Sequence, residues 1–156
     1  MKYLIVYDSA YGNTEQIARA IASAFAPQDS GEIVRASEVQ PGRMQNADLV
    51  IIGCPTYGGK PTPPMLDLLG RMPDTEVKGL KVAAFDTRLT SKLVGIFGFA
   101  AGKIADNLKK KGANLILPPA GFFVKGSKGP LKEGETERAA RWGKALIEAQ
   151  KMPRPG

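Results

Sequence analysis

The chain of 156 residues contains no histidine and one cysteine, Cys54. Without histidine it lacks the side chain that most often acts as a general base near neutral pH and most often binds transition metals. A single cysteine cannot form an internal disulfide. Because neither a histidine nor a cation is adjacent to Cys54 in the sequence, we expect a packed, unreactive thiol. These absences predict no metal centre and no histidine-based catalytic triad.

Long apolar runs are also missing. No segment approaches the roughly 20 consecutive apolar residues of a membrane-spanning helix, and the apolar run at the amino terminus is too short for a signal peptide. With 43% hydrophobic residues, the chain suits one globular domain with a substantial core. We therefore predict a single domain over residues 1–150 and a tail over 151–156, in a cytoplasmic protein with no membrane partner.

Acidic residues are scarce in the second half of the chain. Residues 1–77 carry 6 Lys+Arg and 9 Asp+Glu, a net charge of −3, whereas residues 78–156 carry 16 and 6, a net charge of +10. This asymmetry favours an acidic partner. The alternative is a solvated basic face, since the run 109–111 lies near a predicted helix end, where cations complement the helix dipole. The basic residues are not interleaved with an aromatic stacking motif, so we predict no nucleic-acid partner.

Strand-like and helix-like segments alternate along the chain. Continuous apolar or β-rich runs predict strands, the last of them broken by two prolines, over 3–6, 32–35, 47–53, 81–85 and 113–117. Amphipathic spacing predicts a helix that includes Ile17 to Phe25 and further helices over 63–71, 99–111 and 135–150. This order predicts an α/β fold, a doubly wound five-stranded parallel sheet with helices on both faces.

A polar loop, Ser9–Thr14, connects the first predicted strand to the first predicted helix. Unpaired N–H groups and the positive end of the helix dipole point at such a loop, and Ser9, Asn13 and Thr14 add hydroxyl and amide donors. Gly12 allows the chain to curl tightly. An ordinary turn with a good helix cap is the alternative. The loop lacks the motifs for nucleoside triphosphates and dinucleotides, so we interpret it as a phosphomonoester site.

Two further loops should converge on this one, because such sheets bind ligands at the carboxyl ends of their strands, where the strand order reverses. The loop 54–61 places Tyr57 beside Gly58 and Gly59, an aromatic face and a bare backbone that can receive a flat ring. A Pro/Gly turn with an incidental tyrosine is the alternative. The loop from Asp86 to Phe99 is long for an αβ unit, which is typical of a functional loop.

These motifs resemble those of the flavodoxin family. Ser9-Ala10-Tyr11-Gly12-Asn13-Thr14 resembles the phosphate loop of flavodoxins, and Pro55-Thr56-Tyr57-Gly58-Gly59 resembles their second flavin loop. The likeness spans nearly the whole chain, and the stretch from Val124-Lys125-Gly126 to Trp142 is similar to the last strand and helix of the short-chain group. Within that group, the segment 7–15 is most similar to the flavodoxin domains of flavodiiron proteins.

The resemblance implies a flavodoxin-like fold and FMN as a non-covalent cofactor that transfers single electrons between redox partners, without a catalytic side chain. It implies that the first loop holds the phosphate, that Tyr57 stacks on the flavin ring, and that Thr87 and Arg88 meet the pyrimidine edge of that ring. The cofactor-binding residues so implied are Ser9, Ala10, Tyr11, Gly12, Asn13, Thr14, Pro55, Thr56, Tyr57, Gly58, Gly59, Thr87 and Arg88.

The chain also departs from the family pattern. Gly59 stands where typical flavodoxins carry a carboxylate, Tyr11 stands where many have threonine, and the net charge is +7 rather than strongly negative. We therefore expect a monomer whose redox partners present a neutral or acidic docking face. We also expect a less negative potential for the second reduction of the flavin than in an acidic flavodoxin.

Two other functions compete with the electron carrier. The long third loop and the positive charge favour an FMN-dependent NAD(P)H:quinone-type reductase, although no nicotinamide fingerprint is visible. The third possibility is a domain of this fold that has lost its flavin and binds an acidic partner.

Overall fold

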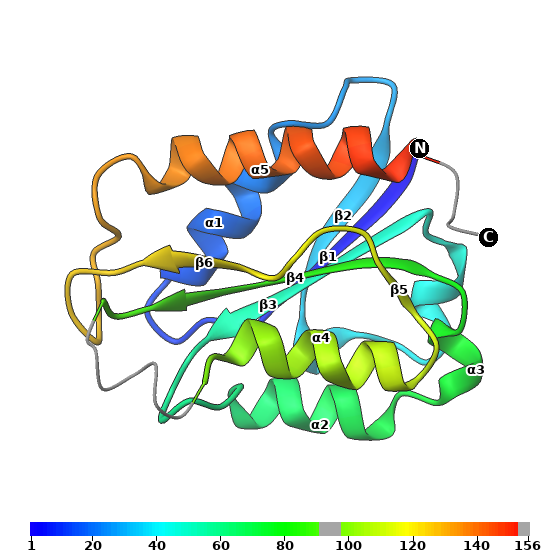
Figure 1. The fold of residues 1–156 in the computed structure, drawn as a ribbon, viewed down its shortest axis with the longest axis horizontal. Helices are drawn as coiled ribbons and strands as arrows, with labels where there is room; N and C mark the ends of the chain where they lie inside the picture. Colours follow the sequence, from blue (N-terminus) through cyan, green and yellow to red (C-terminus); the bar gives the residue numbers. More distant parts are fainter. Residues whose placement is uncertain (91–97, 153–156) are drawn as a thin grey trace.

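A parallel sheet forms the centre of the molecule (Figure 1). The computed structural model describes residues 1–90 and 98–152. Its strands are β1 (Lys2–Tyr7), β2 (Ser30–Arg35), β3 (Leu49–Pro55), β4 (Lys81–Arg88), β5 (Asn114–Leu115) and β6 (Ala120–Phe123). Their spatial order is β2-β1-β3-β4-β5, and β6 also pairs with β4. The predicted doubly wound parallel sheet is confirmed, and its strand order reverses between β1 and β3.

Helices cover both faces of this sheet (Figure 1). They are α1 (Asn13–Ala22) and α5 (Glu135–Gln150) on one face and α2 (Pro63–Arg71) and α4 (Ala100–Lys110) on the other. Successive residues of β1 enter different cores, because Leu4 packs in the cluster that contains Met65 of α2, and Ile5 packs in the cluster that contains Ile17 of α1. Burial on both faces explains why the strands are continuous apolar runs in the sequence.

Most of the predicted elements lie close to the observed ones. Helices 63–71 and 135–150 match α2 and α5, and the predicted helix 99–111 is observed over Ala100–Lys110. The sequence did not indicate the short helix α3 (Asp74–Val77) or the 3-10 turns at Ala36–Glu38 and Arg43–Asn46. Strand β4 continues to Arg88 rather than ending at Phe85, because its last residues pair with β3 and β6. The residues 86–88 therefore belong to a strand and not to the third loop.

The fifth strand position differs most from the prediction. Only Asn114–Leu115 of the predicted strand 113–117 pairs with β4, and after Pro118-Pro119 the chain returns to β4 as β6. Proline has no N–H to donate, so the two prolines divide this edge of the sheet into two short strands. The strand expected at Val124–Gly126 ends at Phe123, although Val124 N still donates to the backbone oxygen of Arg88 at 3.0 Å and Val124 forms an isolated bridge with Leu131.

The lysine run at the end of α4 has a structural part and a solvated part. Lys111 Nζ donates to the backbone oxygen of Met72 at 2.6 Å and also to that of Leu69, which satisfies carbonyls at the carboxyl end of α2. Lys109 and Lys110 are exposed. The run is therefore partly a helix-end contact rather than a purely solvated face.

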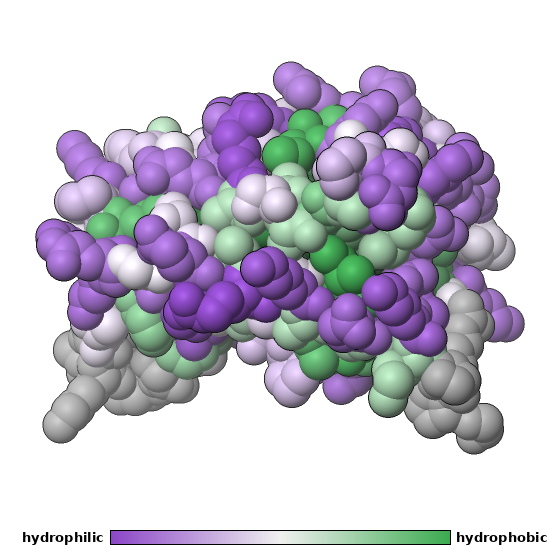
Figure 2. All heavy atoms as spheres, turned by 90° about the horizontal axis from the view of Figure 1, so that it is seen from above, coloured by the Kyte–Doolittle hydropathy of each residue, from purple (hydrophilic) through white to green (hydrophobic). Residues whose placement is uncertain are grey.

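The face that carries α5 is largely hydrophilic, with small apolar areas between charged side chains (Figure 2). In the ranges 1–90 and 98–152, no helix is both long enough and apolar enough to cross a membrane. Residues 153–156 of the predicted tail lie outside the described residues, as does most of the third loop, 91–97.

Candidate functional site

The predicted phosphate loop is a tight turn at the amino end of α1. Gly12 has φ +88°, a conformation that side chains disfavour, and it is the N-cap residue of the helix. Its N–H donates to Ser9 Oγ at 3.0 Å, and Arg35 Nη1 donates to the backbone oxygen of Ser9 at 3.1 Å. The first N–H groups of α1 have no partner within the helix, so this end of the helix can bind an anion.

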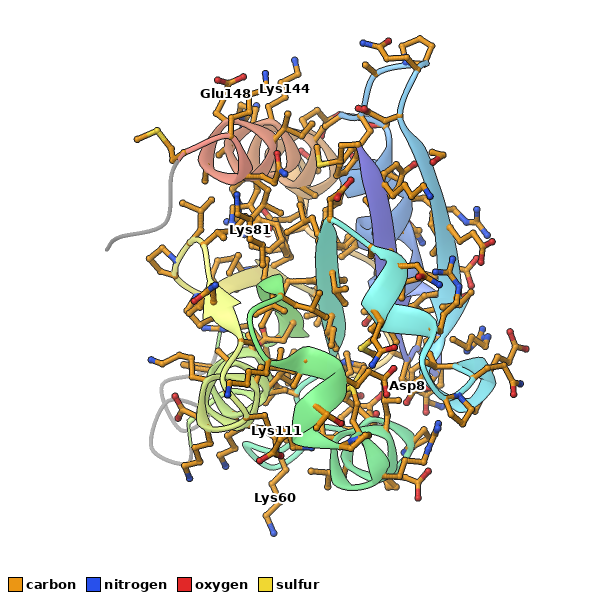
Figure 3. The ribbon with its side chains drawn as sticks, turned by 90° about the vertical axis from the view of Figure 1, so that its right-hand side faces the viewer. Asp8, Lys60, Lys81, Lys111, Lys144 and Glu148 are labelled. Carbon is orange, nitrogen blue, oxygen red and sulfur yellow. The ribbon has the colours of Figure 1, made fainter. Side chains whose placement is uncertain are left out.

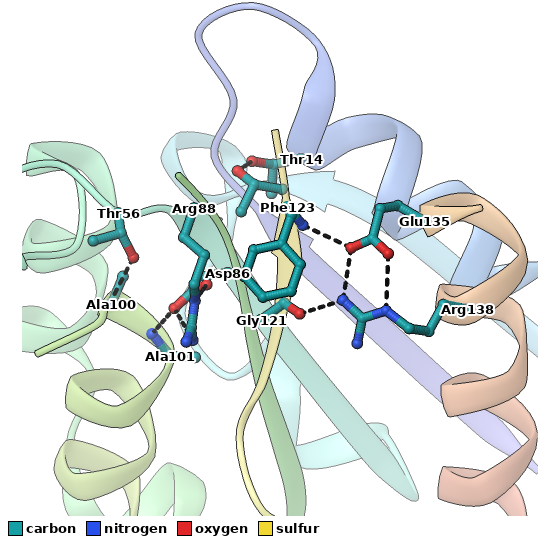
Figure 4. Close-up of polar contacts among 11 residues, drawn as sticks. Thr14, Thr56, Asp86, Arg88, Ala100, Ala101, Gly121, Phe123, Glu135 and Arg138 are labelled. Atoms are coloured by element: carbon teal, nitrogen blue, oxygen red, sulfur yellow. Dashed lines mark hydrogen bonds and ion pairs between the residues drawn. The ribbon is translucent and has the colours of Figure 1, made fainter. Parts of the chain in front are cut away.

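Asn13 and Thr14, predicted as donors to a ligand, also hold the surrounding elements together. Asn13 Nδ2 donates to the backbone oxygen of Lys128 at 3.2 Å, which ties α1 to the loop after β6. The hydroxyl groups of Thr14 and Thr87 lie 2.8 Å apart, and both side chains are buried (Figure 4). The first turn of α1 is thereby attached to the carboxyl end of β4.

A partly buried polar cluster lies beside the loop. Tyr7 Oη donates to Glu15 Oε1 at 2.8 Å, and the guanidinium of Arg35 lies 5.2 Å from the centre of the Tyr7 ring. Burial and the bond to Glu15 raise the pKa of Tyr7, whereas the same bond and the nearby Arg19 lower the pKa of Glu15. This cluster fixes the direction in which β1 enters the loop.

One pocket brings the three predicted loops together. It is lined by ten of the predicted site residues, Ser9, Ala10, Tyr11, Asn13, Thr14, Pro55, Thr56, Tyr57, Thr87 and Arg88. Gly12, Gly58 and Gly59 are not among its lining residues. Leu89, Val124 and Ser127 line it as well. The sequence reasoning missed Val124 and Ser127, although they follow the last strand at the same edge of the sheet, where the rule for parallel sheets would have included them.

Two exposed tyrosines flank this pocket. Tyr57 and Tyr11 are 41% and 53% exposed, which is unusual for aromatic side chains and leaves their rings available for stacking. Tyr57 is held by a two-residue turn, because its N–H and C=O each pair with Lys60 at 3.0 Å. Gly58 and Gly59 both have positive φ, as such a turn requires. Burial, together with nearby Tyr11, raises the pKa of Tyr57.

The Arg88 side chain contacts other residues of the protein (Figure 4). Its Nε and Nη2 atoms donate to the two carboxylate oxygens of Asp86 at 2.7 and 2.9 Å, and its guanidinium lies 3.5 Å from the centre of the Phe99 ring. Asp86 is fully buried and also accepts the N–H of Ala101 at 2.9 Å, near the amino end of α4. Arg88 therefore lines the pocket while its positive charge is balanced by the carboxylate of Asp86.

The second loop also contacts α4. Thr56 Oγ1 accepts the N–H of Ala100 at 2.9 Å (Figure 4). The carboxylate of Asp86 and the hydroxyl of Thr56 together satisfy two of the N–H groups that open this helix. The end of β4, the second loop and the start of α4 are thereby fixed relative to one another beside the pocket.

Uncharged polar, aromatic and apolar side chains make up nearly all of the described pocket lining. Among the described lining residues, Arg88 alone is charged, and it is paired with Asp86. Burial raises the pKa of the Cys54 thiol to about 12, which keeps this thiol protonated and unreactive at neutral pH. In the described part of the chain, no three His, Cys, Asp or Glu side chains gather where a metal ion could be held.

The sequence is similar to proteins of one known family. A family model described as flavodoxin matches residues 5–142. The chain belongs to the flavodoxin family. A flavodoxin from Maridesulfovibrio salexigens is 32% identical over 123 residues, which cover 74% of this chain and 81% of that protein.

Solved structures of flavodoxins and flavodiiron proteins share the fold. A flavodoxin from the domain Archaea has a TM-score of 0.80 at 22% identity, over 97% of this chain and 100% of that chain. The flavodiiron protein of Giardia intestinalis has a TM-score of 0.76 at 20% identity, over 96% of this chain but 36% of its own. The likeness to a short-chain flavodoxin, predicted from the motifs, is confirmed.

FMN is the cofactor of flavodoxins, and the residues of this pocket fit its two ends. The amino end of α1 and the hydroxyl and amide groups around it suit a phosphate. The exposed ring of Tyr57 suits a flat heterocycle. As a flavodoxin, the protein is an FMN-binding electron-transfer flavoprotein.

Proposed function

We propose that this flavodoxin is a monomeric one-electron carrier that shuttles single electrons between protein partners, with residues 1–150 as its single domain. The observation that supports this most is the pocket itself, which has an exposed aromatic face and whose one charged side chain among the described lining residues, that of Arg88, is ion-paired. Bound FMN supplies the redox chemistry. The residues of the chain then have three tasks, which are to hold the phosphate, to hold the ring and to present its edge to a partner.

The phosphate is held by the first loop without an ion pair. Ser9, Asn13 and Thr14, with the backbone of Ala10, Tyr11 and Gly12, form this end of the site. The Thr14 hydroxyl is held in place by its hydrogen bond with the Thr87 hydroxyl at 2.8 Å, so its position beside the phosphate loop is fixed before the cofactor binds. Preorganisation lowers the entropy cost of binding.

The ring is held between the second loop and the end of β4. Tyr57 stacks on the ring, and Pro55, Thr56, Gly58 and Gly59 shape the approach to it. Thr87 and Arg88 meet its pyrimidine edge. The carboxylate of Asp86 balances the charge of the Arg88 guanidinium. The guanidinium therefore orients the ring through hydrogen bonds and adds little net positive charge beside it.

The partner meets the exposed edge of the site with a neutral or acidic surface. The loop after β6 carries Lys125, Lys128 and Lys132, and Lys128 Nζ lies 5.8 Å from the centre of the Tyr11 ring. Positive charge at this rim attracts an acidic face and speeds its encounter at low salt.

An anaerobic redox titration of the FMN-loaded protein tests the proposal. We expect two separate one-electron steps and negligible turnover of NADPH with a quinone. A single two-electron step with rapid NADPH oxidation would instead identify a reductase. Protein that does not quench FMN fluorescence would exclude both functions.

A further inference from the structure

A second hollow opens at the end of the molecule opposite the flavin site. It has a volume of about 830 Å³ and is lined by Lys81, Lys109, Ala113, Asn114, Leu115, Ile116, Leu117, Glu148, Ala149 and Met152. β5 pairs with the first residues of β4, whereas the flavin pocket contains the last residues of β4. We call this hollow the β5 groove. It lies between the carboxyl ends of α4 and α5, and Figure 3 views the molecule from this end.

β5 and β6, the two short strands that pair with β4, differ in whether side chains cover their outer edges. The outer edge of β6 is closed, because Phe123 N donates to Glu135 Oε2 at 2.7 Å and the backbone oxygen of Gly121 accepts from Arg138 Nη2 at 2.5 Å (Figure 4). These side chains come from α5 and occupy the positions that another strand would take. An added strand therefore cannot pair with β6.

Within residues 1–90 and 98–152, no hydrogen bond covers the outer edge of Leu115 in β5. Asn114 N donates to the backbone oxygen of Leu80, just before β4, at 2.7 Å, and Ile116 N donates to that of Val82 in β4 at 3.1 Å. The N–H and C=O groups of Leu115 therefore turn away from β4, and the same alternation places the N–H of Leu117, just after β5, on the outer side. Leu115 and Leu117 also line the β5 groove. The groove therefore offers backbone donors and acceptors beside apolar side chains, which is what an extended peptide needs in order to bind.

The walls of the β5 groove are apolar and its rim is basic. Met152 is 65% exposed and lies beside Ala149, and Lys109 is exposed on the opposite wall, at the end of α4. Lys81 points toward α5 and donates to the backbone oxygen of Gln150 (Figure 3). The only acidic lining residue among those described, Glu148, is ion-paired with Lys151 at 3.4 Å. The uncompensated charge at this rim is positive.

We propose that an extended, acidic segment of a partner protein binds in the β5 groove as an additional strand on β5. Its backbone pairs with Leu115 and Leu117, its apolar side chains lie against Ala149 and Met152, and its carboxylates face Lys109. A second copy of this chain is disfavoured as the occupant, because its net charge is +7 and the same basic rim would face itself. Binding here leaves the flavin edge free, so a partner can be tethered while electrons are exchanged at the other end.

Nuclear magnetic resonance of the FMN-loaded protein tests this with a short acetylated peptide that alternates valine with aspartate. We expect the amide resonances of Leu115 and Leu117 to shift and saturate with a Kd of about 1 mM or tighter. The matched peptide with lysine in place of aspartate should bind at least about tenfold more weakly. Absence of shifts at these two residues, or equal binding of the two peptides, would overturn the proposal.

Variants separate strand pairing from general attraction of charge. Lys109→Glu should weaken peptide binding about three- to tenfold, whereas Lys60→Glu, the same charge change in the second flavin loop, should not change it. Leu117→Pro removes one outward N–H without removing a bond to β4, and it should also weaken binding. Shifts of the same resonances that grow with protein concentration in the absence of peptide would identify a second copy as the occupant and refute the acidic segment. The redox titration does not depend on this groove, so either proposal can fail alone.

Discussion

The two tyrosines beside the flavin pocket are held in different ways. Tyr57 is fixed through its backbone by the turn with Lys60, so its ring keeps its place independently of its hydroxyl group. The Tyr11 ring lies near the ammonium of Lys128, 5.8 Å from the ring centre, which is a cation–π distance. Stacking on FMN should therefore depend on the ring of Tyr57 and not on its phenol.

Replacing Tyr57 tests this distinction. Tyr57→Ala should weaken FMN binding about tenfold to a hundredfold, because stacking on an aromatic side chain is worth roughly 1–3 kcal/mol. Tyr57→Phe, the matched control, should stay within about threefold of the unmodified protein. Fluorescence titration of FMN gives both values. Equal losses in the two variants would mean that the hydroxyl group carries the contact.

Asp86 combines complete burial with two structural roles, as the partner of Arg88 and as an acceptor for α4. Asp86→Ala should lower the free energy of unfolding by about 3–5 kcal/mol, because it leaves the mostly buried guanidinium of Arg88 without its counter-charge. Asp67→Ala removes the exposed pair with Arg71, where the Asp67 side chain is 74% exposed, and should cost less than about 0.5 kcal/mol. Urea denaturation of both variants provides the measurement, and similar costs would contradict this account.

At the scale of elements, helix α5 closes one part of the sheet edge with its first turn. Glu135 accepts the N–H of Phe123, and Arg138 binds both Glu135 and the backbone oxygen of Gly121. The pair with Arg138, and then the bond from Phe123, lower the pKa of Glu135. The charged form of Glu135 is thus the stabilising form.

This sets a pH window for the contact. A lowered folded-state pKa contributes stability above the unfolded value near 4.5, and this contribution is lost as the pH falls through the folded value. Glu135→Gln should therefore lower stability by about 1 kcal/mol at pH 7, and this loss should shrink progressively as the pH is lowered below about 4.5. Glu137→Gln, an exposed change in the same helical turn, should show neither the loss nor this pH dependence. In Glu135→Ala, hydrogen exchange of the Phe123 amide should become faster.

The elements also show which parts of the fold a sequence can predict. Periodicity predicted α2 and α5 because each has an apolar stripe that the local sequence displays completely. Strand β6 was missed because its pairing with β4 and its closure by α5 depend on residues that the local pattern does not contain. The same distinction applies to the site. The loop motifs predicted most of the pocket lining. The hydrogen bond from Asn13 to Lys128 could not be predicted in this way, because it joins residues 115 positions apart in the sequence.

At the scale of the whole molecule, the chain has a positive net charge, whereas FMN gains negative charge on reduction. Two unit charges about 10 Å apart in water interact by about 0.4 kcal/mol, or about 20 mV for one electron. The net charge of +7 should therefore make the second reduction of FMN less negative than in an acidic flavodoxin. A spectroelectrochemical titration that gave an ordinary, very low potential would contradict this expectation.

Charge reversal within this chain provides a sharper comparison. Lys128→Glu, beside Tyr11, should lower the second potential by about 20–40 mV at low salt, and added salt should diminish the difference. Lys2→Glu makes the same change at the amino-terminal end of β1, away from the pocket, and should shift the potential by much less. Equal shifts would show that net charge, and not position, sets the potential.

The single tryptophan of the chain lies where the sheet and α5 meet. The Trp142 ring is packed edge-on against Phe85 of β4 and Phe122 of β6, with ring centres 6.2 and 6.0 Å apart. Its indole emission therefore reports on one defined interface, free of signal from any other tryptophan. Flavins absorb in the range where indole emits, so the same residue is an intrinsic donor for energy transfer. Unfolding of α5 from the sheet and loading of the cofactor can thus be followed as two optical signals from an unlabelled protein.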